Sequence, residues 1–244
     1  MPQAPIQPEM KGVIVACPTP FDEKGSVALD PLGNHIDACI AEGVHGFWIN
    51  GCSGLATMLS LEERKQIAQY AQDKIAGRVP MWVHVGSWNT EDSCHLAQHA
   101  RDHGAIGVST LPPLFYITNI DRVIEHMTAI QKAADLPITY YHVPGVTKLA
   151  LDAQQLVEMC KRVPQVAAIK FSDIDIFKAA IIREHLPHVR LMSGFEEILL
   201  AGLAMGCYDG TVGAGQNFLP GPLVDVYNAF EAGDIAKARH IHRG

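Results

Sequence analysis

Eight short apolar runs, separated by longer stretches with helical periodicity, constrain the fold of this chain most strongly. The runs are continuous rather than alternating, which is typical of strands buried on both faces of a parallel sheet. Eight such strands with intervening helices predict an α/β fold, a closed (β/α)₈ TIM barrel, and the length of 244 residues suits one. A Rossmann-like sheet is disfavoured because no G-x-G-x-x-G follows the first run. The predicted strands are 13–17, 46–50, 81–85, 107–111, 138–142, 166–171, 190–193 and 210–212.

The helical stretches lie between these strands. Their predicted ranges are 31–42, 61–76, 90–103, 119–134, 152–162, 175–185 and 195–205. Ser60 (with Glu63 three residues on), Thr90 and Asp152 are predicted N-caps. Two more helical pieces, near 222–231 and 234–242, follow the eighth strand. We therefore expect residues 1–221 to form the barrel domain, which would also hold the catalytic site. Residues 222–244 are expected to form a short, truncated C-terminal helical extension.

Composition excludes several classes of function. The net charge of -7, with basic residues scattered along the chain, argues against a nucleic-acid partner. The six cysteines form no C-x-x-C pair, which is typical of reduced thiols rather than a disulfide framework. The first ten residues do not resemble a signal peptide, and no apolar run approaches the ~20 residues that span a bilayer. We expect a cytoplasmic protein without a membrane partner.

The sixth predicted strand carries the most unusual residue for its position. Lys170 follows four apolar residues and shares a strand face with Val166 and Ala168, which are small enough to leave its stem room. An apolar pocket would lower the pKa of this lysine and expose a nucleophilic amine. The competing interpretation is a lysine that extends from the strand end into water. The local sequence does not decide between the two.

Other strand ends offer polar groups that would meet Lys170 at the mouth of a barrel. Tyr141, in the fifth strand, has a hydroxyl that can move a proton, although two adjacent tyrosines also suit a core. The second strand runs into a glycine-bracketed turn, Gly51–Gly54, whose N–H groups can face a carboxylate. The seventh strand is followed by Glu196 and Glu197, which suit either substrate hydroxyls or the first turn of a helix.

Taken together, these segments give a family resemblance over nearly the whole chain. Ile169–Asp173 resembles the imine-forming lysine segment of the N-acetylneuraminate lyase / dihydrodipicolinate synthase family, and Tyr140–Pro144 resembles its catalytic tyrosine segment. The resemblance implies a (β/α)₈ class I aldolase that binds pyruvate through Lys170, with Tyr141 as proton carrier. It also implies a second relay tyrosine at Tyr116, contributed across a subunit interface of a homotetramer.

Within that family, the segments around Tyr141, Lys170 and Gly194 resemble the N-acetylneuraminate lyase branch. This likeness implies recognition of sugar hydroxyls by an acidic pair after the seventh strand. The dihydrodipicolinate synthases have an arginine where this chain has Val146, which argues against that activity. The substrate-binding residues expected from the resemblance are Cys52, Ser53, Ser172, Gly194, Glu196, Glu197 and Val212.

Three departures from the family pattern keep other functions open. Cys52 replaces the hydroxyl of the proton relay, Leu55 replaces a glutamate, and Ala214–Gly215 replaces a Ser-Thr pair. Leu55 is shared with some 2-keto-3-deoxy sugar-acid aldolases. The alternatives are such an aldolase, a dihydrodipicolinate synthase-like enzyme, or a non-catalytic relative that binds 2-oxo acids.

The predicted reaction is cleavage or formation of a 4-hydroxy-2-oxo acid, with pyruvate and an aldehyde as the other partners. We expect no metal and no organic cofactor, because a protonated imine is itself the electron sink. A metal-dependent hydrolase is the competing enzyme class. It is prompted by His95, His99 and His103, which recur every four residues on one helix face.

Overall fold

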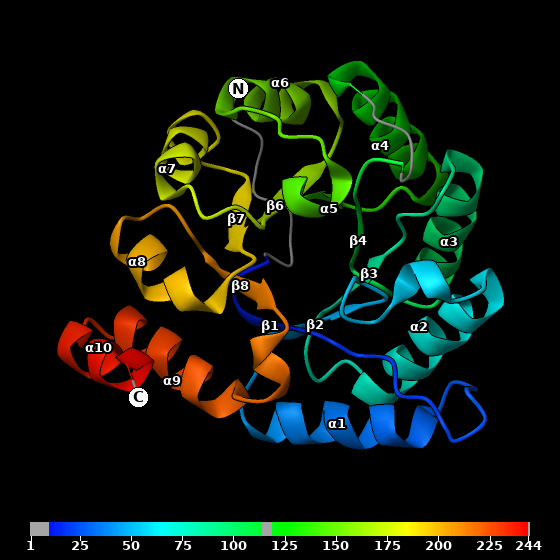
Figure 1. Ribbon diagram of the computed structural model, residues 1–244, viewed down its shortest axis with the longest axis horizontal. Helices are drawn as coiled ribbons and strands as arrows, with labels where there is room; N and C mark the ends of the chain where they lie inside the picture. The colour runs from blue at the N-terminus through cyan, green and yellow to red at the C-terminus, as the bar shows by residue number, and fades with distance from the viewer. Residues whose placement is uncertain (1–9, 114–118, 244) are drawn as a thin grey trace.

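The computed structural model describes residues 10–113 and 119–243. Its eight strands are parallel and form a closed barrel in sequence order, so the predicted (β/α)₈ fold is confirmed (Figure 1). The strands are β1 (Gly12–Ala16), β2 (Gly46–Ile49), β3 (Met81–His84), β4 (Gly107–Thr110), β5 (Ile138–His142), β6 (Val166–Phe171), β7 (Arg190–Ser193) and β8 (Gly210–Gly213).

The helices form a ring around the strands (Figure 1). They are α1 (Leu29–Ala41), α2 (Leu61–Ile75), α3 (Thr90–Asp102), α4 (Ile120–Ala134), α5 (Pro144–Thr147), α6 (Ala153–Arg162), α7 (Ile176–His185), α8 (Leu199–Ala204), α9 (Pro220–Glu231) and α10 (Ile235–Arg243), with 3₁₀ turns η1 (Ala56–Met58), η2 (Glu196–Ile198) and η3 (Gly215–Asn217). Ser60 and Asp152 cap α2 and α6 as predicted. The cap of α3 is Asn89 instead of Thr90, because the Asn89 side chain accepts from the N–H of Asp92.

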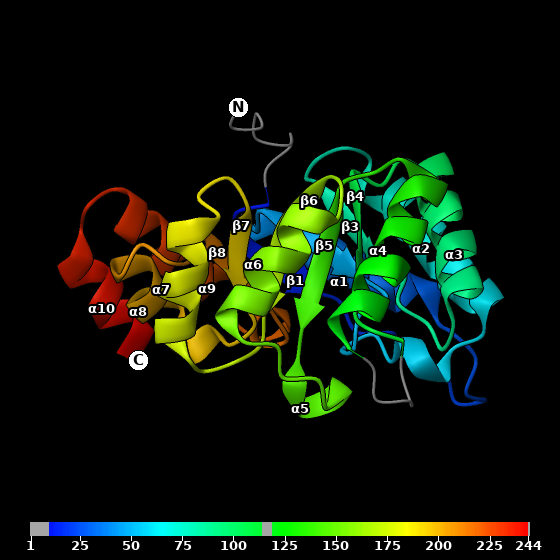
Figure 2. The same ribbon diagram turned by 90° about the horizontal axis from the view of Figure 1, so that it is seen from above.

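Two details near the barrel mouth differ from expectation. The short helix α5 was not predicted; it begins at Pro144, whose missing N–H costs nothing in a first turn. Figure 2 shows α5 projecting beyond the end of β5. The helix expected over 195–205 is instead the 3₁₀ turn η2 followed by α8.

The barrel closes where β8 pairs with β1, and two glycines make this seam. Gly210 pairs with Gly12, and a Cβ at Gly210 would lie 2.0 Å from the backbone oxygen of Gly12. Gly12 itself has a φ of 78°, which L side chains rarely adopt. The first and last strands can therefore pair at this register only without side chains at these two positions.

The strands are buried on both faces, as their continuous apolar runs predict. Outward-facing side chains pack under the helices in one large core. Inward-facing side chains, among them Ile14, Trp48, Trp82 and Met192, fill the barrel interior. Because large rings occupy this interior, the space left for a ligand lies toward the C-terminal ends of the strands.

Helices α9 and α10 form the C-terminal part of the described chain. Helix α9 follows β8 and packs against β1, so it occupies the place of the eighth barrel helix. The domain boundary expected between residues 221 and 222 therefore falls inside α9. Helix α10 packs on α9 (Figure 1). It also reaches η2, where His242 Nε2 lies 3.1 Å from the Glu196 carbonyl.

A buried arginine fixes the loop after β3. Arg64, in α2, is 2% exposed and donates to the carbonyls of His84 (2.8 Å) and Gly86 (3.0 Å). Its own carbonyl accepts from Asn50 Nδ2 at 2.8 Å. This one residue therefore links the ends of β2 and β3 at the barrel mouth.

Arg64→Met is expected to lower the free energy of unfolding by about 2–4 kcal/mol, because two buried carbonyls lose their donors. Urea denaturation would measure the loss. Lys65→Met is the matched control on the next residue; its ammonium pairs with the exposed Glu62, so we expect a change within about 0.5 kcal/mol. Equal stability of the two variants would contradict the role given to Arg64.

Candidate active site

Lys170 lies inside the barrel near the C-terminal end of β6. It is 5% exposed, and its neighbours in register are Tyr141 on β5 and Met192 on β7. The Nζ atom lies 4.4 Å from the ring centre of Tyr141 and 5.0 Å from that of Trp48. The side chain therefore does not extend into water, and the interpretation of Lys170 as a solvated lysine does not hold.

The environment of Lys170 favours its neutral form. Burial lowers the pKa of the ammonium to about 8, while the nearby Cys52 and Glu196 act in the opposite direction. Desolvation wins because the amine sits among rings and aliphatic side chains. An appreciable fraction of Lys170 is therefore an uncharged amine near neutral pH, as a nucleophile requires.

The hydroxyl of Tyr141 lies between Cys52 and Ser172. Burial raises the pKa of Tyr141, the nearby Cys52 raises it further, and a hydrogen bond with Ser172 lowers it. The net direction is upward, so the phenol stays protonated at neutral pH. It is placed to donate a proton to an oxygen that develops charge next to Lys170.

The turn after β2 offers unused backbone donors. The N–H groups of Gly54, Leu55 and Ala56 bond within the turn. The N–H groups of Cys52 and Ser53 have no acceptor in the part of the chain that the structure describes. A Cβ at Gly51 would lie 2.6 Å from Trp48 Nε1, so glycine is required for the turn to pack this tightly. Two adjacent free N–H groups suit a carboxylate.

The structure separates the two predicted acidic residues. Glu196 faces the barrel mouth, where its carboxylate accepts from the Gly215 N–H and contributes to the electrostatics of Lys170. Glu197 is exposed and lines a different hollow, between α8 and α10. Two consecutive residues of a 3₁₀ turn point in different directions, so the pair does not act on one ligand group in this arrangement.

The remaining predicted residues are also placed. Ser172 follows β6 and lies against Gly194, whose Cα is close enough that a Cβ would meet the serine hydroxyl oxygen at 1.9 Å. Val212 is fully buried in the barrel interior beside Met192. Tyr116, expected as the second relay tyrosine, lies outside the described residues.

Sequence reasoning missed His84, which ends β3 and faces the same space. Its ring stacks on Trp48 (5.9 Å between ring centres) and meets Tyr141 edge-on (6.0 Å), and its Nδ1 lies 3.1 Å from Ser109 Oγ. Burial is the main cause that lowers the pKa of His84, and the nearby Arg64 and Lys170 lower it further, so the ring is neutral. The sequence did contain a signal for this position. Trp82 and His84 are two residues apart on one strand, so their rings share a face and both point into the barrel.

The metal-site alternative receives no support from the described ranges. His95, His99 and His103 belong to α3 and its C-cap, on the outside of the barrel, and the rings of His99 and His103 stack at 4.0 Å. Across residues 10–113 and 119–243, no group of three or more His, Cys, Asp or Glu side chains could hold a metal ion. In the same ranges, no helix is long and apolar enough to cross a membrane.

A hollow of about 440 Å³ opens beside Lys170 at the barrel mouth. Cys52 and His84 belong to its lining and connect it to the lysine and tyrosine. Its lining residues are Cys52, Leu55, Ala56, Thr57, Met58, His84, Trp88, Leu111 and Val146.

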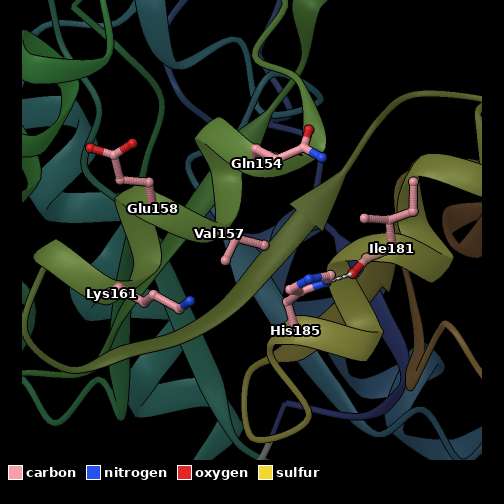
Figure 3. Close-up of a pocket in the computed structure, with 6 residues that line it drawn as sticks. All are labelled: Gln154, Val157, Glu158, Lys161, Ile181 and His185. Carbon is pink, nitrogen blue, oxygen red and sulfur yellow. Dashed lines mark hydrogen bonds between the residues drawn. The ribbon is translucent and has the colours of Figure 1, made fainter.

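A second hollow, of about 320 Å³, lies on the outer surface between α6 and α7 (Figure 3). All the side chains drawn there come from these two helices. His185 bonds back to the carbonyl of Ile181 at 2.9 Å. Because no strand end reaches this hollow, it is separate from the site around Lys170.

A closed (β/α)₈ barrel with a desolvated lysine and a protonated tyrosine at its mouth defines a class of lyases and aldolases. The model of the dihydrodipicolinate synthetase family matches residues 9–244. The chain belongs to this family, whose members are lyases and aldolases, and the resemblance inferred from the sequence is confirmed.

Individual relatives agree with this assignment. The chain is 32% identical to the N-acetylneuraminate lyase of Rattus norvegicus, over 94% of this chain and 74% of that protein. It is 30% identical to the N-acetylneuraminate lyase of Citrobacter koseri, over 96% and 78%. Among solved structures it resembles YagE, a prophage protein of the dihydrodipicolinic acid synthase family from E. coli K12 in complex with pyruvate. That match has a TM-score of 0.92 and 27% identity, over 96% of this chain and 79% of that one.

Proposed function

We propose that the chain is a class I aldolase that forms an imine between Lys170 and pyruvate. The observation that carries this proposal is the buried Lys170 amine, with its lowered pKa, next to the Tyr141 hydroxyl. The YagE complex with pyruvate and the N-acetylneuraminate lyase relatives support the same chemistry. The proposed reaction cleaves a 4-hydroxy-2-oxo acid to pyruvate and an aldehyde, or forms it from them.

The proposed steps use residues of this chain alone. The free N–H groups of Cys52 and Ser53 hold the pyruvate carboxylate, with the Ser53 hydroxyl beside them. The neutral amine of Lys170 attacks the 2-oxo carbon, water leaves, and a protonated imine remains. In cleavage, the C3–C4 bond breaks and its electron pair moves into the imine to give an enamine. The Tyr141 oxygen takes the proton of the 4-hydroxyl as its own proton passes through the relay to C3 of the enamine, and water then hydrolyses the resulting imine and releases pyruvate from Lys170; condensation runs through the same steps in reverse.

The relay is the part of the proposal in which this chain departs from its family. The thiol of Cys52, beside Tyr141, is a weaker hydrogen-bond partner than a hydroxyl. A non-catalytic relative would bind pyruvate through Lys170 without releasing or consuming it. Cys52→Thr separates the two, because only an active aldolase with a weak relay would gain turnover from the restored hydroxyl.

Trapping with borohydride tests the proposal directly. The protein is incubated with pyruvate and sodium borohydride, digested, and searched by mass for a reduced adduct on Lys170. The same reaction without pyruvate is the blank, and the exposed Lys161 of the same sample is an internal control. An adduct on Lys161 as strong as that on Lys170, or no adduct at all, would refute the imine.

The lowered pKa of Lys170 predicts how imine formation depends on pH. With a pKa of about 8, the neutral fraction rises from about 10% at pH 7 to about 90% at pH 9. The rate of imine formation at low pyruvate is therefore expected to rise about tenfold over this interval and then level off. Stopped borohydride trapping from pH 6 to 10 would measure it. A rate that still rises steeply above pH 9 would indicate an ordinary lysine.

A further inference from the structure

The mouth hollow beside Lys170 is built from groups that do not bind sugars well. Leu55, Ala56, Met58, Leu111 and Val146, which belong to its lining, have side chains of carbon and sulfur atoms. No acidic or basic side chain belongs to the described lining, apart from the neutral His84 and the thiol of Cys52. A polyhydroxylated group placed here would leave most of its hydroxyls without partners.

Several of these apolar side chains are exposed to solvent at the mouth. Met58 is 77% exposed, Val146 is 55% exposed and Leu55 is 41% exposed. Leu55 also has a φ of 54°, a left-handed conformation that is unfavourable for leucine. Exposed apolar side chains around a hollow, one of them on a strained backbone, are typical of a ligand site.

On the opposite side of the mouth, the predicted acidic pair is not available as a pair for a sugar chain. Glu196 already accepts from the Gly215 N–H, and Glu197 faces the hollow beside α10. The mouth thus has an apolar side, formed by the ends of β2, β3 and β4 with α5, and an opposite side that carries Glu196, whose carboxylate already accepts a hydrogen bond. The volume of about 440 Å³ on the apolar side suits a small organic group.

We infer that this hollow holds the aldehyde half of the substrate, and that this half is aromatic or branched aliphatic rather than a polyol. The inference rests on the proposed aldolase function. Cys52 and His84 line the hollow and also reach the lysine and tyrosine, so a group in the hollow has its carbonyl carbon next to the enamine. The neutral ring of His84 and the thiol of Cys52 are polar groups that face both halves of the substrate in the described site.

The test is a condensation assay with the whole chain, saturating pyruvate and four aldehydes. Benzaldehyde and 3-methylbutanal represent the apolar class, and D-erythrose and N-acetyl-D-mannosamine represent the hydroxylated class. Pyruvate consumption gives kcat/KM for each aldehyde. We expect the apolar pair to exceed the hydroxylated pair by about tenfold or more. Higher kcat/KM for the hydroxylated pair would overturn the inference.

Matched variants locate the preference in the hollow. Met58→Gln lies in the lining, whereas Met205→Gln makes the same change at an exposed methionine (55% exposed) after α8, at the opposite end of the barrel. We expect Met58→Gln to lower the benzaldehyde to erythrose ratio by about tenfold and Met205→Gln to leave it unaltered. Leu55→Asn is a second lining variant that suits the left-handed backbone and is expected to act in the same direction. An unchanged ratio in both lining variants would refute the hollow as the aldehyde site.

The pyruvate adduct on Lys170 separates the two levels of the proposal. It is measured without aldehyde in the parent protein and in each variant. An adduct without the apolar preference refutes this inference and leaves the aldolase function standing. Absence of the adduct in the parent protein refutes the aldolase function, and the inference fails with it.

Discussion

Lys170→Met is expected to abolish pyruvate release and, at the same time, to make the folded chain more stable at pH 7. The loss of activity follows because removal of an imine-forming nucleophile removes the proposed pathway altogether. A methionine fills nearly the same volume, so the barrel interior is expected to pack as before. Residual pyruvate release above about 0.1% of the parent rate would contradict the assignment.

The gain in stability follows from the sign of the pKa shift. Lys170 has a pKa of about 8 in the folded chain against 10.5 for an ordinary lysine, so the folded state resists protonation. Below pH 8 the folded protein carries the whole cost of this difference, which corresponds to about 3 kcal/mol at most. We expect Lys170→Met to raise the free energy of unfolding by about 1–3 kcal/mol at pH 7, and the gain to shrink as pH approaches 10.5.

Urea denaturation at pH 7 and pH 9.5 would measure both the gain and its pH dependence. The matched control is Lys161→Met, because Lys161 is an exposed lysine on α6. That variant is expected to keep full activity and to change stability by less than about 0.5 kcal/mol at either pH. A destabilised Lys170→Met protein would mean that the ammonium is well accommodated in the fold.

Tyr141→Phe is expected to lower kcat for pyruvate release by about 10²–10³, because the phenol is the proposed proton carrier. The ring that lies 4.4 Å from the Lys170 amine remains in the variant, so the pyruvate adduct on Lys170 should still form. Steady-state pyruvate release and borohydride trapping, measured on the same preparation, would separate proton transfer from imine formation.

The preceding residue supplies the control for this experiment. Tyr140 is 1% exposed and belongs to the outer core under the helices, while Tyr141 belongs to the barrel interior. Tyr140→Phe removes the same atom from the other side of the same strand, and its kcat is expected to stay within about twofold of the parent. Equal losses in the two variants would show a general effect on β5 instead of a role in the reaction.

The fold could be predicted because strand burial leaves a clear pattern in the sequence. Three strands, β5, β6 and β7, have the predicted bounds, and the others differ by a residue or so at their ends. The short helix α5 was missed because four residues are too few to show a period, and Pro144 had suggested only the end of a strand. The Asn89 cap was missed by one residue, since Asn and Thr are both favourable caps.

The site was predictable only in part, because strand position gives the face of a residue but not its neighbours in space. Lys170 and Tyr141 could be expected together since each ends an adjacent strand, and the structure brings them into register. The separation of Glu196 from Glu197 depends on a 3₁₀ turn, whose side-chain directions leave no periodic signal. His84 was passed over because a histidine that follows three apolar strand residues cannot be told from a core residue by its position alone.

The glycine seam has a consequence for how this protein is made. Strands β1 and β8 pair in space but lie nearly a whole chain apart in the sequence. The barrel therefore cannot close until residue 213 has left the ribosome. Until then the free edge of the first strand is exposed and can pair with a neighbouring nascent chain. The glycine at position 210 makes correct closure selective, because at this register a residue with a Cβ there would meet the Gly12 backbone.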